Sequence, residues 1–583
     1  MSATIQPVKP DHALPMTQER ALALANLYIK VKDETKLRSI LSWLADHLPD
    51  LSDGQIGQFL RLAGSAGHAD LVARGISQAG TRMLIELTLA MALFRLAIEM
   101  EDKSLAVEMK SALGDRVAPT FEAQFRIEAS LLLDGPHKAL ELARSLRKRA
   151  TSPEAAVQSA QLLIDTGQAR LASRYLRLCA RRWPAAPRIA LVLVRSFVQA
   201  GDPDGGLHWL EANEHRLPAK NVPDLRRTLL IAQGQIDEAM KLLESEIEAG
   251  QRPAGDTLLL QIYCSKGCLK EAEEVAAALR NDPRFPKRKG AHFGISVPGV
   301  ALNELRLYNL VKGSHSGALP DPSLTETNLH AASVVLDQWT SREASQVVRA
   351  DSLSRNIFQY WNTSTRPPEL AQIMQTWQNV PGWTYSCLDK PTAKKWLGDT
   401  FGATHARAFV LARHVAEESD FFRLCRLYHS GGIYADADDM LTGDPNDLVG
   451  DGQKLIVYRE PLGMLANNVI IAPPGHAAIG RAIDMAMAAL LARDNDSIWS
   501  KTGPGLLTRA VAAHVQAAPE DAATDTIVLP QYRLHRNVHP HMKLPYKNTS
   551  RYWNSQAVRQ QDAVSLALQA VLDVPKMKIP TFS

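Results

Sequence analysis

The sequence predicts two parts of different fold class, an array of helical hairpins over residues 17–282 and an α/β domain over residues 351–583. Two observations predict them. In the first half, predicted turn residues recur every 32 to 34 positions, which is typical of stacked helical repeats. After residue 353, short apolar runs alternate with helical patterns, which is typical of an α/β domain. The runs that predict strands are Ile357–Phe358, Thr384–Ser386, Ile433–Tyr434, Leu455–Val457 and Val469–Ile471. Residues 283–350 are predicted to connect the two parts.

The predicted turns share a small or polar residue, and several are followed by a small residue four or five positions later. They fall at Asp33, Gly67, Glu101, Gly135, Gly167, Gly201, Gly234 and Gly267. A hairpin of this kind buries one face and needs its neighbours to complete a core. The pattern resembles the tetratricopeptide repeat, which implies a concave surface that recruits a protein partner. A generic helical bundle is the alternative. We expect Arg181 and Arg182 to lie on solvated faces.

The repeat period ends after Arg280. Pro283, Pro286 and Gly290 surround the basic run Lys287–Lys289, and prolines and glycines in such numbers are typical of a domain boundary. We expect this run to be a solvated linker, with contact to an acidic lipid or a phosphorylated acceptor as the alternative.

Composition favours a soluble globular protein. The 583 residues are 45% hydrophobic and 22% charged, and the net charge of +4 is too small to argue for a nucleic-acid partner. The five cysteines are scattered without a disulfide pattern, which favours a reducing compartment. Residues 1–20 contain no apolar segment of signal-peptide length. We expect a cytoplasmic protein, with peripheral contact at the inner face of the membrane if its acceptor is lipid-linked.

The pattern with the most chemical information lies in the second half. Apolar residues at helical spacing predict a helix over Phe421–Tyr428, and Gly431 and Gly432 predict its end. Ile433–Ala435 then predicts a buried strand.

Charged residues lie on this helix and directly after this strand. Asp436 and Asp438 follow the strand two positions apart, so an extended backbone would point both carboxylates the same way. Asp420 and Arg423 lie three apart on the helix and share one face. A hard divalent cation prefers such carboxylate oxygens. A cation bound there would also bind the oxygens of a diphosphate.

The segments S-D-x-x-R and G-G-I-Y-x-D-x-D resemble the sugar-binding signature of the DXD-containing glycosyltransferases, which are related to the yeast initiating mannosyltransferases and to the glucosyltransferase domains of large clostridial toxins. The resemblance covers residues 353–560. It implies a GT-A type α/β fold, a divalent metal (Mn²⁺ or Mg²⁺) and a nucleotide-sugar donor. It also implies retaining transfer of a hexose to a polysaccharide, a lipid-linked saccharide or a protein acceptor.

Other segments resemble further parts of that family. These are Asn356–Trp361, Pro381–Tyr385, Asn467–His476 and Thr502–Gly505. The family often has histidine where this chain has Phe358, so no role is assigned to that position.

Roles for the acidic residues follow from the resemblance and from the chemistry of the donor. Asp438 is the first choice for direct contact with the metal, and Asp436 would hold the ribose or share the ion. Asp439 could replace either, because spacing alone does not distinguish them. Asp420 and Arg423 resemble the pair that holds the sugar hydroxyls, and Arg423 would also neutralise phosphate charge.

Aromatic residues and a late segment complete the predicted site. Trp361 either stacks on the nucleotide base or is a core tryptophan, and Tyr434 either packs beside the nucleotide or belongs to the strand core. In the segment Arg551–Ser555, Asn554 or Ser555 would reach the metal.

Three histidines lie close together late in the sequence. His535, His539 and His541 have metal-ligand spacing, but we expect them at the surface or the acceptor rim.

Three alternative functions were compared with the sequence. A phosphotransferase of the haloacid dehalogenase type would need Thr or Val where Met440 stands. An EF-hand loop would need glycine in place of Leu441. The remaining alternative is a non-catalytic repeat scaffold with a transferase-like nucleotide-binding domain.

Overall fold

A computed structural model of the chain describes most of its residues. The described ranges are 16–31, 33–78, isolated positions between 87 and 98, 103–115, 117, 119–146, 152–281, 297–314, 328–340, 354–449, 454–494 and 497–548. The chain forms two compact units. One comprises residues 1–149 and 545–552, and the other comprises residues 150–544 and 553–583.

The described residues of the first unit are mainly helical. Its described helices are α1 (Gln18–Val31), α2 (Glu34–Asp46), α3 (Asp53–Ser65), α4 (Ala69–Gln78), α6 (Lys103–Gly114), α7 (Pro119–Leu133) and α8 (Pro136–Leu146). The helices of each successive pair pack against each other, as in α1 with α2 and α7 with α8. Leu41, Phe59, Phe94 and Phe125 are fully buried in their shared core.

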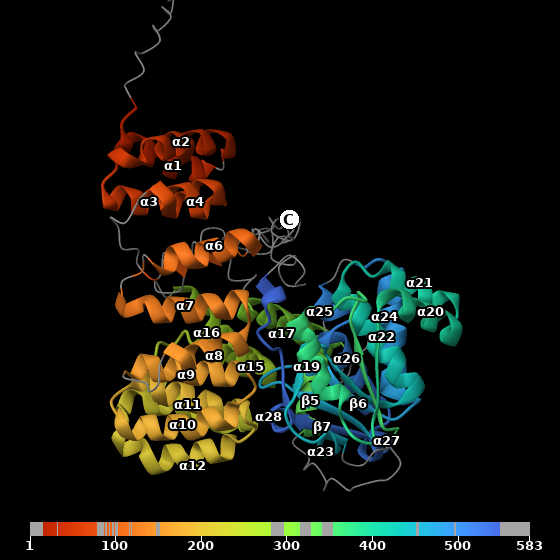
Figure 1. Cartoon of the computed structure of the whole chain (residues 1–583). Coiled ribbons are helices and arrows are strands. Elements are labelled where there is room, and N and C mark those ends of the chain that lie inside the picture. The colour runs from red at the N-terminus through yellow and green to blue at the C-terminus, as the bar shows by residue number, and fades with distance from the viewer. Residues whose placement is uncertain are drawn as a thin grey trace, which may run out of the picture. The chain divides into compact units, whose positions relative to one another are not determined.

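The second unit begins with helical hairpins. They pair α9 (Pro153–Asp165) with α10 (Ala169–Arg182), α11 (Pro187–Gln199) with α12 (Pro203–Asn213), α13 (Val222–Gln233) with α14 (Ile236–Glu248), and α15 (Thr257–Lys266) with α16 (Leu269–Asn281) (Figure 1). The predicted turn glycines Gly167, Gly201, Gly234 and Gly267 all have φ between 68° and 83°. The helix turns therefore fall where the sequence predicts them, and the predicted turn at Glu101 lies outside the described residues.

Two helices follow the hairpins. α17 (Val297–Ser314) packs on α15 and α16 through Leu302 and Leu305. α18 (Asn328–Thr340) contacts α17, and it also places Val335 and Leu336 in the core that covers the sheet.

The C-terminal region contains a mixed sheet with the strand order β2-β1-β3-β6-β5-β7. Its strands are β1 (Asn356–Tyr360), β2 (Thr384–Leu388), β3 (Gly432–Ala435), β5 (Leu455–Arg459), β6 (Leu465–Ala472) and β7 (Thr526–Pro530). β1 is parallel to β2 and β3, whereas β6 is antiparallel to β3 and β5. A separate antiparallel pair joins β4 (Met440–Leu441) to β8 (Val538–His539).

Helices cover both faces of this sheet. On one face Phe358, Tyr434 and Ile470 pack beneath α22 (Val415–Ser430), α24 (Ala477–Leu491) and α26 (Pro504–Ala517) (Figure 1). On the other face Ile357 and Ile433 pack with Trp377 of α19 (Pro368–Gln378). The remaining helices are α20 (Lys390–Phe401), α21 (Ala403–Leu411), α23 (Asn446–Val449), α25 (Ile498–Lys501), α27 (Pro519–Asp525) and α28 (Tyr532–His535).

Apolar runs in the sequence predicted five of the six strands of the mixed sheet. β1, β2, β3, β5 and β6 each contain a predicted run, whereas β7 and the β4–β8 pair were not predicted. All five cysteines are free thiols. Within the described residues, no helix combines the length and the apolar character that crossing a bilayer requires.

Candidate functional site

The candidate site begins where α22 ends and β3 starts. Gly431 ends the helix with φ of 60°, and Gly432 follows with φ of 116°, a conformation that favours glycine. A Cβ atom on Gly432 would lie 2.4 Å from the backbone oxygen of Asn356 in β1. The sharp turn between helix and strand therefore depends on glycine, and the predicted order of helix, glycine pair and strand is confirmed.

Asp420 is buried on α22 and accepts hydrogen bonds on both carboxylate oxygens. Asn467 Nδ2 donates to Oδ1 at 2.9 Å, and Thr502 Oγ1 donates to Oδ2 at 2.9 Å. The guanidinium of Arg423 lies 3.1 Å from Oδ1. Burial raises the pKa of Asp420 to about 6, although Arg423 opposes this shift.

Arg423 joins the helix to the end of the strand. Its Nη2 lies 3.0 Å from Asp436 Oδ1, and its Cζ lies 4.4 Å from the ring centre of Tyr434. The Tyr434 hydroxyl donates to the same oxygen of Asp436 at 2.8 Å. Burial disfavours the charge of Arg423, but Asp436 and Asp420 outweigh this and raise its pKa. The structure thus brings together four of the predicted residues.

The backbone of Asp436 is held by neighbouring strands. Its N–H donates to the Asn468 oxygen in β6 at 2.8 Å, and its own oxygen accepts from Gln359 Nε2 at 3.0 Å. Tyr385 OH in turn donates to Gln359 Oε1 at 2.8 Å. Three strands therefore position this one residue at the edge of the sheet.

Asp439 is fully buried and differs from Asp438 in its surroundings. Its carboxylate accepts from Asn468 Nδ2 and from the His541 N–H, and its backbone oxygen accepts from Trp377 Nε1 at 2.7 Å. Burial, with the like charges of neighbouring carboxylates, raises the pKa of Asp439 to about 7. The side chain of Asp438 is half-buried, and its backbone oxygen accepts from Met542.

The predicted aromatic residues lie near this arrangement in the fold. Trp361 directly follows β1 and is half-buried, and its backbone N–H donates to the Leu388 oxygen. Tyr434 is fully buried beneath Arg423. Asn554 and Ser555 lie outside the described residues.

The three late histidines lie in different environments. His535 and His539 are buried, whereas His541 is exposed and has φ of 54°. His535 Nδ1 lies 3.3 Å from the Val198 oxygen. Burial lowers the pKa of His535 to about 4, so its ring is neutral at pH 7.

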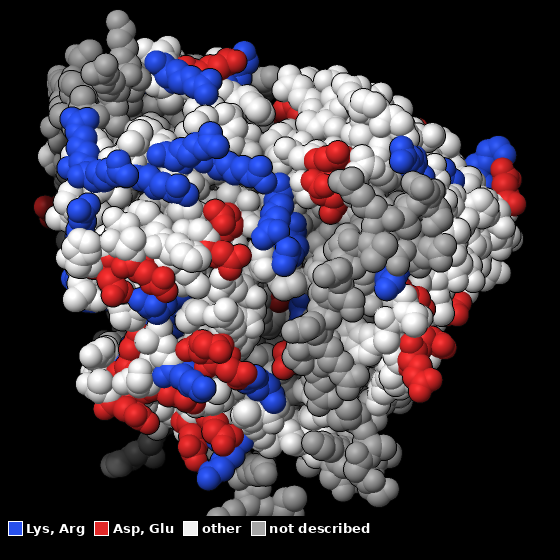
Figure 2. Space-filling model, turned by 90° about the horizontal axis from the view of Figure 1, so that it is seen from below, with Lys and Arg blue, Asp and Glu red and all other residues white. Residues whose placement is uncertain are grey.

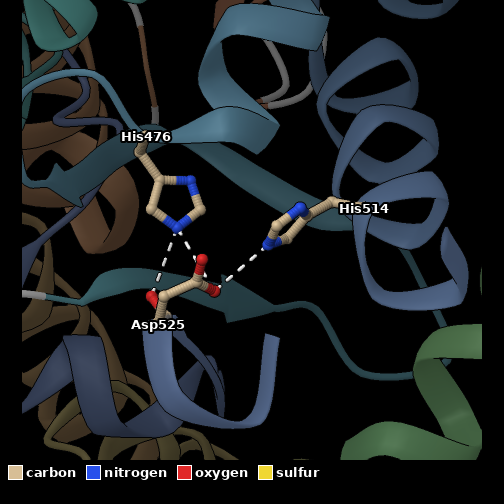
Figure 3. Close-up of side chains that lie close together, drawn as sticks. All are labelled: His476, His514 and Asp525. Atoms are coloured by element: carbon tan, nitrogen blue, oxygen red, sulfur yellow. Dashed lines mark hydrogen bonds and ion pairs between the residues drawn. The ribbon is translucent and has the colours of Figure 1, made fainter. Parts of the chain in front are cut away.

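Another cluster of histidine and carboxylate joins α24, α26 and the residue that precedes β7 (Figure 3). His476 Nε2 and His514 Nε2 lie 3.5 and 3.1 Å from Asp525 Oδ1. His476 Nδ1 accepts the Ala478 N–H at 3.2 Å, so the proton of the neutral ring is on Nε2 and faces Asp525. His476 Nε2 lies 3.2 Å from the backbone oxygen of Asp525, and His514 Nε2 is within hydrogen-bonding distance of the Asp525 carboxylate, so Asp525 contacts both rings.

Several residues contact the predicted site residues in the structure, although the sequence alone gave no reason to assign them a role. Asn467 contacts Asp420 through its amide, and its backbone oxygen accepts from Arg423. Thr502 also contacts Asp420, and Gln359 holds Asp436. The polar pair Asn467-Asn468 interrupts the apolar sequence of β6, and this interruption could have identified Asn467 as a candidate site residue.

Comparison with known proteins identifies the region around these residues. Residues 366–454 match a family model described as the glycosyltransferase sugar-binding region containing DXD motif. No curated protein matches the sequence. The solved structure titled "PaToxG Glycosyltransferase" is 18% identical with a TM-score of 0.24, covering 30% of this chain and 73% of that chain.

A second solved structure, "Structure of Naa15/Naa10 bound to HypK-THB", is 13% identical with a TM-score of 0.22, covering 70% of this chain and 66% of that chain. TM-scores this low do not define a shared fold.

The matched region contains the parts of the site that α22 and β3 position. Asp420, Arg423, Asp436 and Asp438 all lie within residues 366–454. The resemblance seen in the sequence and the family model agree on this region, and its buried charged residues converge at one edge of the sheet. The chain is therefore a glycosyltransferase with a DXD-containing sugar-binding region.

Proposed function

We propose that the protein is a metal-dependent, retaining glycosyltransferase that moves a hexose from a nucleotide-sugar to a polysaccharide, a lipid-linked saccharide or a protein acceptor. The main supporting observation is the convergence of Asp420, Arg423 and Asp436. Arg423 contacts both carboxylates, at 3.1 and 3.0 Å. Charged groups that donate and accept hydrogen bonds in so fixed a geometry suit the hydroxyls of a sugar.

The carboxylates Asp436 and Asp438 would hold the metal. They offer only oxygen ligands, which suits Mn²⁺ or Mg²⁺. Burial and the neighbouring charge of Asp438 raise the pKa of Asp436, and a bound cation would relieve this repulsion. The metal would stabilise negative charge on the departing diphosphate. We assign Asp438 to direct contact because Asp439 already accepts hydrogen bonds from Asn468 and His541.

The chain's own residues would orient the donor. Asp420 would accept hydrogen bonds from sugar hydroxyls, and its contacts with Asn467 and Thr502 fix the direction of its carboxylate. Arg423 would donate to a hydroxyl or a phosphate oxygen while it holds Asp436. Trp361 would stack on the nucleotide base, and Asn554 or Ser555 would approach the metal.

We also propose a fold type, a role for the repeats and a cellular location. We assign the mixed sheet to the GT-A type and the hairpins with glycine turns to tetratricopeptide-like repeats that recruit a partner or the acceptor. The protein would act in the cytoplasm, with peripheral contact at the membrane if the acceptor is lipid-linked.

A donor screen tests the proposal. Purified protein with Mn²⁺ is incubated with UDP- and GDP-sugars, and nucleotide release is measured. The double variant Asp436→Asn/Asp438→Asn should abolish release. The matched control Asp447→Asn changes an exposed carboxylate on α23 and should leave release unchanged. Release that persists in the double variant would contradict the site assignment, and a wild-type protein that binds no nucleotide would favour the scaffold alternative.

A further inference from the structure

Helix α10 presents a stripe of arginines on its exposed face. Its buried face packs against α9 and α11 through residues such as Ala172 and Leu176. The exposed arginines follow one another at spacings of four, three and four residues, which aligns them along one side of the helix. They are Arg170, Arg174, Arg177 and Arg181.

The stripe is not neutralised by carboxylates. Among the ion pairs formed by described residues, none involves these four arginines. Their contacts are of other kinds: Arg170 donates to the backbone oxygen of Arg536 at 3.1 Å, and Arg177 lies over the ring of Phe197. Elsewhere in the same unit arginines are paired, as Arg227 and Arg252 are with Glu246. Like charges at these helical spacings repel one another, so the stripe is suited to an anionic partner.

Apolar side chains are interleaved with the arginines. Leu171 and Leu178 are 45% and 64% exposed and lie seven residues apart, so they share one side of the helix. Each directly follows an arginine of the stripe, so the two leucines form a row beside the stripe, rotated from it by about 100° around the helix. A partner that fits this face would offer both acidic and apolar groups.

A pocket of about 70 Å³ lies at the C-terminal end of the stripe. Arg177, Arg181 and Arg216 line it together with Trp209 and Asn213. Guanidinium groups bind carboxylates with two parallel hydrogen bonds, and the indole offers an adjacent apolar surface. The pocket therefore suits a carboxylate that stands next to an apolar side chain.

The opposite end of the stripe adjoins the transferase region. The Arg536 oxygen that accepts from Arg170 lies between α28 and β8. β8 pairs with β4, which directly follows Asp439. From Arg170 to Arg181 the helix rises by about 16 Å, so the stripe runs from the edge of the transferase region to the pocket.

We propose that the α10 stripe and its pocket bind an acidic, leucine-containing segment of a polypeptide. The inference rests on the proposed recruiting role of the repeats. The face seen in Figure 2 has a band of blue side chains on the repeat side, with red acidic side chains on the same face. A flat anionic membrane would also meet those acidic groups, and a nucleic acid would leave the two leucines without partners.

The test uses the full-length chain and a fluorescein-labelled peptide of repeated Glu-Glu-Leu, with binding measured by fluorescence anisotropy. The variant Arg174→Glu/Arg181→Glu should weaken binding at least about tenfold. The control Lys241→Glu/Lys270→Glu makes the same change of charge at exposed positions of α14 and α16 and should stay within about twofold of the wild type. If the charge reversal alters the circular dichroism spectrum, Arg174→Gln/Arg181→Gln provides the same test.

Three results would overturn the proposal. They are no binding of the peptide, equal loss in the control variant, or stripe-dependent binding of phosphatidylserine vesicles or of a single-stranded oligonucleotide in place of the peptide. Nucleotide release from the donor should be unchanged in Arg174→Glu/Arg181→Glu. Peptide binding without any nucleotide release would therefore count against the proposed transferase activity and leave this inference standing.

Discussion

Arg423 is the residue on which the geometry of the candidate site depends most. Its guanidinium lies between Asp420 and Asp436 and over the ring of Tyr434. All these groups are buried or half-buried, so each carboxylate is stable there because the cation is present. Removing one member of a buried ion pair leaves the other charge uncompensated.

Replacing Arg423 with methionine should therefore cost about 3–5 kcal/mol of unfolding free energy. Urea denaturation followed by circular dichroism would measure it. The matched control Arg407→Met removes an exposed arginine of α21 and should change stability by less than about 0.5 kcal/mol. Equal stabilities for Arg423→Met and the control would show that the buried network does not support the fold.

The buried ring of His535 should make the folded protein less stable in acid. Its pKa falls from 6.5 to about 4 in the folded protein because the ring is buried. Below pH 6.5 the unfolded chain binds a proton that the folded chain does not, so stability falls as the pH is lowered toward 4. This one side chain should account for about 3 kcal/mol of that loss.

The variant His535→Leu should show a shallower decline of unfolding free energy between pH 7 and pH 5, measured by urea denaturation at several pH values. Parallel curves for the variant and the wild type would contradict the assignment of a neutral, buried imidazole to this position.

At the scale of elements, the turn from α22 into β3 positions the site. Gly432 places β3 beside β1, and Ala435 then delivers Asp436 to the edge of the sheet opposite Asn468. A side chain on Gly432 would meet the backbone of Asn356, and backbone atoms cannot move aside as a flexible side chain can.

Gly432→Ala should consequently destabilise the protein by well over the 1–2 kcal/mol that a positive φ alone costs an alanine. Gly475→Ala is the matched control, because Gly475 also has a positive φ but has open space around its Cα. Thermal unfolding of both variants provides the comparison. A smaller loss for Gly432→Ala than for Gly475→Ala would contradict the packing described for this turn.

Local patterns were enough to predict this element, but not the residues that complete the site. The helix, the glycine pair, the strand and Asp436 lie within about twenty residues. Gln359, Asn467 and Thr502 reach the site from distant segments, and spacing along the chain contains no information on such contacts. β7 was missed because it ends in proline, a residue that usually argues against a strand.

At the scale of the whole molecule, the second unit joins helical hairpins to the transferase region. The turn at Gly201 packs against α28, where a Cβ atom would lie 2.6 Å from the Tyr532 oxygen. Lys543 also lies 3.1 Å from Asp165, at the end of α9. The hairpins therefore support the segment that forms β8 and, through it, β4.

Gly201→Ala should for this reason reduce nucleotide release as well as stability. Gly234→Ala lies in an equivalent turn with a positive φ and no neighbouring atoms, so it should lower stability alone. Release per folded molecule, with the folded fraction measured by circular dichroism, separates the two effects. Equal release from both variants would show that the hairpin turn does not influence the transferase region.

We propose that acidic side chains at the end of β3 bind a divalent cation that the donor requires. Electron paramagnetic resonance of free Mn²⁺ measures this binding, with the protein titrated in the presence of UDP or GDP. We expect the wild type to deplete the free-ion signal, whereas Asp436→Asn/Asp438→Asn should leave it unchanged. Equal depletion by the two proteins, or none by the wild type, would contradict this proposal.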